Sequence, residues 1–129
     1  MKAKSVTQDI AVKVETSYHD HESQPDANSY VFTYRITIHN QGEHTVKLLR
    51  RYWHVTDSNT LKQEIEGEGV VGRQPVLEPG EQHQYTSGCN LQTDIGKMEG
   101  FFTMEKVGTG EQFYVYTPAF QMIDPSRYN

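Results

Sequence analysis

A chain of 129 residues with no apolar run of about 18 residues is predicted to form one soluble domain that does not insert into a membrane. Its net charge of -5 argues against nucleic-acid binding and against binding to anionic lipid, because both need a basic surface. A single cysteine excludes an intrachain disulfide, and the N-terminus lacks the apolar core of a signal peptide. We therefore expect a cytoplasmic protein in which residues 1–129 form a single domain, with a core over about 8–123 and a short tail at 124–129.

Most of the chain alternates between apolar and polar residues with the period of a β-strand. The predicted strands are 8–18, 30–40, 46–56, 61–66, 82–87, 97–107 and 112–116, with a final edge segment at 118–123. In the first of them Ile10, Val12 and Val14 share one side, which is expected to face the core. In the third, the face that carries Trp53 is expected to point inward at the far end of the strand.

Turn signals separate these strands, and no stretch has helical periodicity. Asn40-Gln41-Gly42-Glu43 and Pro79-Gly80 are typical turn sequences, and Gly108-Thr109-Gly110 joins two alternating segments as in a hairpin. Seven to eight short antiparallel strands predict an all-β immunoglobulin-like sandwich. Because one cysteine cannot form the inter-sheet disulfide of true immunoglobulin domains, a fibronectin type III-like sandwich is the better variant. A small closed barrel is the alternative.

The segment 67–90 holds five of the ten glycines, three of which form G-x-G-x-x-G at Gly67, Gly69 and Gly72. In a dinucleotide-binding fold this motif opens a helix, but Pro75 and Pro79-Gly80 stand where that helix would run. The dinucleotide-binding interpretation is therefore rejected, and the glycines are expected to shape a loop, turn or bulge.

A backbone nest at the same glycines is the alternative to a purely structural role. It would bind an anion such as pyrophosphate or a nucleotide, with Arg73 beside the motif and Arg50 or Arg51 adding charge.

The remaining polar residues include few candidates for metal ligands or catalytic groups. His19 and His21, within His-Asp-His-Glu, are weak metal candidates because no third ligand follows at a suitable spacing, and a solvated loop is the simpler interpretation. Cys89 has no activating partner by spacing and is expected to be a buried thiol. With no catalytic constellation, the chain is predicted not to be an enzyme and to need no cofactor.

Adjacent aromatic residues are the best sequence argument for a partner. Phe101 and Phe102, and likewise Phe113 and Tyr114, are neighbours, so one of each pair must point away from the core. Outward aromatic residues mark interfaces, which predicts a protein partner or a homo-oligomer. The basic and aromatic run Arg50–His54 splits between two strand faces, so it does not predict a nucleic-acid site.

Several motifs together resemble the ApaG family. They are Arg51-Tyr52-Trp53 followed by Thr56-Asp57, then GEGVVGRQPVLEPGE, YTSGC, MEGFFTM and PAF, and the resemblance extends from about residue 8 to 123. It implies a fibronectin type III-like sandwich in a small bacterial protein, without a family enzyme activity. It also implies an association with cobalt resistance and with Mg²⁺ and Co²⁺ efflux, and a domain that larger eukaryotic proteins reuse, among them F-box proteins and a DNA polymerase delta-interacting protein.

Reuse as an attached module favours binding over catalysis. We accordingly expect a non-catalytic protein-binding module with an indirect role in cation efflux. The alternatives are binding of pyrophosphate or a nucleotide at 67–73, and direct binding of a divalent metal.

Overall fold

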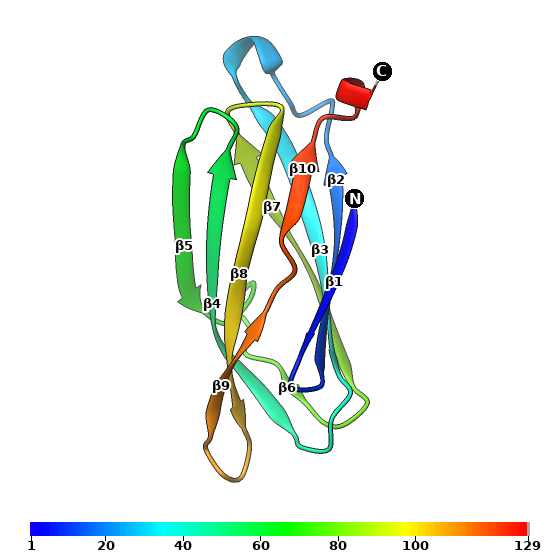
Figure 1. Ribbon diagram of the computed structural model, residues 1–129, viewed down its shortest axis with the longest axis vertical. Helices are drawn as coiled ribbons and strands as arrows, with labels where there is room; N and C mark the ends of the chain where they lie inside the picture. Colours follow the sequence, from blue (N-terminus) through cyan, green and yellow to red (C-terminus); the bar gives the residue numbers. More distant parts are fainter. Residues whose placement is uncertain (129) are drawn as a thin grey trace.

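The computed structural model describes residues 1–128, which form ten strands in two antiparallel sheets that pack face to face (Figure 1). The four-stranded sheet has the order β1 (Lys2–Thr7), β2 (Ile10–Tyr18), β3 (Tyr30–Asn40) and β7 (Gln82–Leu91). The six-stranded sheet contains β4 (Val46–Asp57), β5 (Lys62–Glu68), β6 (Val76–Leu77), β8 (Ile95–Lys106), β9 (Gln112–Tyr116) and β10 (Phe120–Ile123). Strands β4 and β8 lie at its centre; β5 and β6 pair with β4, and β9 and β10 pair with β8. The all-β sandwich is confirmed.

Residues 1–128 contain two short 3-10 helices, Pro25–Ala27 and Pro125–Tyr128, and no α-helix. None of the helices in this range has the length and apolar character needed to cross a membrane.

The core forms between the sheets from the apolar side of each alternating strand. Ile10, Val12 and Val14 are at most 1% exposed, so the predicted inner face of β2 is confirmed. Trp53 is the largest fully buried side chain. Its ring meets Phe102 and Phe120 edge-on, with centroids 5.9 Å and 6.0 Å away. Edge-to-face aromatic packing adds to the stabilisation that burial alone provides.

A register shift in β4 explains why its two ends use different faces. Val46 and Leu48 are buried at one end, and Trp53 and Val55 are buried at the other. The first two have even numbers and the last two odd numbers, so strict alternation would place the two pairs on opposite sides of the strand. The pairing of β4 with β8 shifts between Leu48 and Arg50, as in a β-bulge. One extra residue exchanges the inward and outward sides of a strand. The predicted inward position of Trp53 is confirmed.

Two buried polar side chains hold strand ends together. The Asn40 amide donates to the carbonyls of His44 and Leu77, at 2.7 Å and 3.0 Å. Asp57, at the end of β4, accepts hydrogen bonds from the Gln92 amide and the Thr93 hydroxyl. Because each buried group has partners, neither pays the cost of an unsatisfied polar atom.

The sheets contain ten strands where the sequence predicted seven to eight. Strand β1 is an edge strand with Lys2 and Lys4 exposed, so it has no apolar run to reveal it. Strand β6 has two residues and exists only through its pairing with β4. In the predicted tail, Arg127 forms an ion pair with Asp94 at 2.9 Å. The last tail residue, Asn129, lies outside the described residues.

Candidate functional site

Four aromatic side chains gather on the outer surface of the six-stranded sheet. We call Tyr52, Phe101, Tyr114 and Tyr116 the aromatic face. Tyr52 pairs with Phe101 across β4 and β8, and Phe101 pairs with Tyr116 across β8 and β9. The ring of Phe101 lies 5.1 Å from that of Tyr52 and 4.7 Å from that of Tyr114. Tyr114 and Tyr116 are 52% and 53% exposed, so the face presents large rings to solvent.

Strand alternation sends these rings outward. Phe102 is fully buried and Phe113 is 9% exposed, so both fill the core. Their neighbours Phe101 and Tyr114 must then lie on the opposite surface. The prediction that one member of each adjacent pair points away from the core is confirmed.

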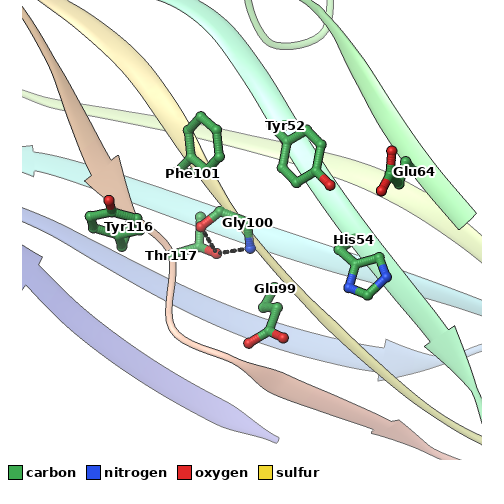
Figure 2. Close-up of a pocket in the computed structure, with 8 residues that line it drawn as sticks. All are labelled: Tyr52, His54, Glu64, Glu99, Gly100, Phe101, Tyr116 and Thr117. Carbon is green, nitrogen blue, oxygen red and sulfur yellow. Dashed lines mark hydrogen bonds between the residues drawn. The ribbon is translucent and has the colours of Figure 1, made fainter. Parts of the chain in front are cut away.

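A hollow of about 340 Å³ lies beside the aromatic face (Figure 2). It is lined by Tyr52, Phe101 and Tyr116 on one half, by His54, Glu64 and Glu99 on the other, and by Gly100 and Thr117 between them. The Thr117 hydroxyl accepts from the Gly100 N–H at 2.9 Å and donates to the Gly100 carbonyl at 3.1 Å. A Cβ at Gly100 would lie 1.9 Å from the Tyr52 carbonyl oxygen, so this position needs glycine for the close approach of β8 to β4.

The polar half of the hollow follows from strand register. Glu64 on β5 lies opposite His54 on β4, and His54 lies opposite Glu99 on β8. Neighbouring strands are about 4.8 Å apart, so the imidazole stands between two carboxylates. Desolvation beside the other rings, followed by interaction with Glu64 and Glu66, raises the pKa of the Tyr52 hydroxyl. Sequence reasoning missed this hollow because its residues come from separate strands, and the family motifs that contain Tyr52, Glu99 and Phe101 do not show which side chains meet in space.

The glycine motif shapes backbone at the end of β5. Gly69 has φ +63°, and a Cβ there would lie 2.2 Å from the Arg73 carbonyl oxygen. Val70 and Arg73 exchange two backbone hydrogen bonds of 2.7 Å and 3.0 Å, which close a tight turn. The Arg51 guanidinium covers Gly67 and donates to the carbonyls of Glu68 and Gly69, both at 3.0 Å. These contacts explain why glycine occupies positions 67 and 69 through the packing of the chain itself.

A second hollow, of about 290 Å³, adjoins this turn. It is lined by Val70, Val71, Arg73, His83, Gln84, Tyr85 and Thr86. Burial and the nearby Arg73 guanidinium lower the pKa of His83. Arg73 is therefore brought beside His83, and not beside Arg50, which shares the outer side of β4 with Tyr52. Anion binding at Gly67, Gly69, Gly72 and Arg73 stays a prediction.

The remaining candidates lie apart from both hollows. The two ring nitrogens of His19 lie 2.8 Å from the Thr33 hydroxyl and 3.2 Å from the Glu22 carboxylate. His21 is exposed. Within residues 1–128, no group of three or more His, Cys, Asp or Glu side chains is placed to hold a metal ion. Metal binding at His19 and His21 stays a prediction.

Cys89 lies partly buried on β7. Burial, with a smaller effect of Asp57, raises the pKa of its thiol to about 11. The thiolate is the nucleophilic form of cysteine, so Cys89 is a poor nucleophile near neutral pH.

The fold and the surfaces described above define a small all-β sandwich domain with an exposed aromatic face. The ApaG domain family matches residues 20–106, and the chain belongs to this family. It is 46% identical to Protein ApaG of Sinorhizobium fredii, over 95% of this chain and 93% of the relative. Protein ApaG of Brucella abortus is 47% identical, over 95% and 94%.

Two solved structures share this fold. A crystal structure described as an ApaA protein from Bordetella pertussis superposes with a TM-score of 0.86 at 39% identity, covering 96% of this chain and 97% of that one. An Archaeoglobus fulgidus protein at 8% identity, with a TM-score of 0.52, shares the fold alone.

Proposed function

We propose that this domain is a non-catalytic module that binds another protein through its aromatic face. The observation that carries the proposal is the exposure of Tyr114 and Tyr116, which pack around Phe101 on the outer surface of the six-stranded sheet. Aromatic residues are enriched at protein interfaces and contribute much of the binding energy there. Stacked rings on β-strands also lose little conformational freedom on binding, because their neighbours already restrain them.

The chemistry of the adjoining hollow supports binding over catalysis. Its described lining residues contain no serine or cysteine nucleophile, and the Thr117 hydroxyl is engaged with both backbone groups of Gly100. The resemblance to the family carries an association with cobalt and magnesium resistance. We propose that any such role is indirect and acts through the bound protein.

Site-directed photo-crosslinking in living cells tests the proposal. A photoreactive phenylalanine analogue replaces Tyr116 in one strain and Lys13 in another, since Lys13 is exposed on the outer side of the four-stranded sheet. We expect a protein adduct of defined mass from position 116 and none from position 13. Absence of an adduct at 116, or equal adducts at both positions, contradicts the proposal. An adduct of two copies of this chain would instead identify a homo-oligomer interface.

A second candidate function is binding of pyrophosphate or a nucleotide at the hollow beside the glycine turn. It is favoured by the convergence of Arg73 and His83 in a hollow whose described lining contains no carboxylate. Titration with pyrophosphate should shift the amide NMR signals of Gly69 to Arg73, and Arg73→Gln should abolish the shift. Arg50→Gln is the control, because Arg50 lies on another surface. No shift at millimolar pyrophosphate would exclude this candidate.

A further inference from the structure

The hollow beside the aromatic face combines two kinds of surface that together select one kind of side chain. Tyr52, Phe101 and Tyr116 supply aromatic rings, and the opposite half supplies the carboxylates of Glu64 and Glu99. A side chain that satisfies both halves needs an apolar stem, a flat face and a positive charge. Arginine has all three, because its guanidinium is planar, stacks on aromatic rings and donates to carboxylates in a fork.

We infer that this hollow receives an arginine side chain from a basic segment of the partner protein. The inference rests on the proposed function, since it specifies the chemistry of the partner that the aromatic face binds. The volume of the hollow, about 340 Å³, is at the small end of the range for ligand sites. This size suits one long side chain that enters from an extended segment. The exposed ring of Tyr114 continues the surface beyond the hollow and would cover an apolar neighbour of that arginine.

The charges around the hollow are arranged for a cation. Glu64 and Glu99 flank His54 on the two neighbouring strands, and Glu66 lies next along β5, opposite Tyr52. The cation nearest to Glu99 is Lys97, whose ammonium nitrogen is 4.0 Å from the carboxylate and therefore at the limit of an ion pair. An exposed contact of this kind contributes little, so an incoming guanidinium can displace it.

The outer surface of the other sheet has the opposite character. Lys4 and Lys13 face each other directly across β1 and β2, and the hollow that they line also includes His39. The only carboxylate of β2 on this side, Glu15, is already paired with Arg35 at 2.6 Å. A basic segment is repelled by this surface and attracted by the carboxylates of the hollow, so charge complementarity favours the hollow.

Binding of defined peptides tests the inference on the full chain. The probe is a fluorescein-labelled hexapeptide, Gly-Ser-Arg-Leu-Ser-Gly, compared with the same peptide carrying citrulline, which keeps the shape of arginine and loses its charge. We expect saturable binding with amide NMR shifts centred on Gly100, Phe101 and Thr117. The citrulline peptide should bind at least about tenfold more weakly, because it forms neither the cation–π contact nor the charged hydrogen bonds.

Neutral variants identify the carboxylates that carry the effect. The double variant Glu64→Gln, Glu99→Gln should weaken binding of the arginine peptide by about tenfold or more. Glu105→Gln is the matched control, since Glu105 lies on the same strand as Glu99 but outside the hollow, and it should change affinity less than about twofold. Equal binding of the citrulline peptide, equal loss in Glu105→Gln, or no saturable binding at millimolar arginine peptide each overturn the inference.

The same double variant in the photo-crosslinking strain separates this inference from the proposed function. Loss of the adduct at position 116 on neutralising Glu64 and Glu99 supports both. An adduct that persists unchanged is consistent with protein binding but overturns the inference that the partner inserts an arginine from a basic segment. Absence of an adduct in the unaltered chain overturns the proposed function itself, whatever the peptides do.

Discussion

The glycine-rich segment 67–73 and the aromatic face are built on adjoining strands, yet they use their residues in opposite ways. In the glycine segment the interactions are within the chain, since Arg51 donates hydrogen bonds to the carbonyls of Glu68 and Gly69. On the aromatic face the special side chains point into solvent. Motifs that resemble the family occur in both regions, but they shape the backbone in the glycine segment and form an exposed surface on the aromatic face. Substitutions in the two regions should therefore affect different properties.

The largest expected effect is loss of stability at Gly69. Gly69→Ala forces a Cβ to within 2.2 Å of the Arg73 carbonyl oxygen at a φ of +63°. We expect the free energy of unfolding to fall by about 3 kcal/mol, from steric overlap and backbone strain together. Gly72→Ala is the control, because its φ is also positive but nothing lies within 4 Å of its added Cβ. It should cost only about 1 kcal/mol. Equal losses in urea denaturation would show that the tight contact at Gly69 is not what requires glycine.

Removal of the Arg51 guanidinium is the next largest change. Arg51→Ala leaves the carbonyls of Glu68 and Gly69 without their donor, and we expect a loss of about 2 kcal/mol in the free energy of unfolding. The neighbouring exposed residue gives the control, since Arg50→Ala should change stability by less than about 0.5 kcal/mol. A small effect of Arg51→Ala on unfolding, together with loss of pyrophosphate binding, would instead assign Arg51 to a ligand site.

Titration of Cys89, near the end of the 67–90 segment, tests whether its thiol is desolvated or reactive. The thiol has an ordinary pKa of 9.0, and burial raises it to about 11 in the folded chain. Because the folded pKa is the higher one, this contribution is complete below pH 9 and is lost as the pH rises towards 11. We expect the folded chain to lose about 2 kcal/mol more stability than Cys89→Ala between pH 8 and pH 10.5. Identical pH profiles would mean that the thiol is not desolvated.

The smallest expected effect on stability belongs to the aromatic face. Tyr114→Ala removes a ring that is 52% exposed, so unfolding should change by less than about 1 kcal/mol, which is the scale of one aromatic pair. Its neighbour Phe113 is buried, and Phe113→Ala should cost about 3 kcal/mol. We expect Tyr114→Ala to reduce crosslinking from position 116 although the chain stays folded. A large loss of stability would assign this ring to folding and weaken the contrast between the two regions.

Strand alternation made much of the fold predictable. The inward positions of Ile10, Val12 and Val14 follow directly from period two, and so does the expectation that one of Phe101 and Phe102 points outward. The prolines after the glycine motif excluded a helix, and residues 67–80 contain none. Strands β1 and β6 were missed because an exposed edge and a two-residue pairing leave no apolar pattern.

The candidate site was less predictable than the fold. The sequence near each adjacent aromatic pair was enough to infer that one ring points outward. That the outward rings form one surface could be known only from the register of β4, β8 and β9. The same holds for His83, which lies beside Arg73 only because the start of β7 adjoins the glycine turn. Contacts between residues far apart in the chain depend on loop lengths and sheet order, which periodicity does not encode.

By itself, the sequence determined the fold class, the family and the inward side of the regular strands. It also determined that no helix follows the glycine motif. Apart from the family, whose motifs are spread over most of the chain, these properties depend on residues close together in the sequence, where side-chain period and proline geometry act directly. Only the tertiary structure decided that Glu64, His54 and Glu99 form one row beside three aromatic rings. That row exists because three strands align in one register, and the sequence of any single strand leaves that register open.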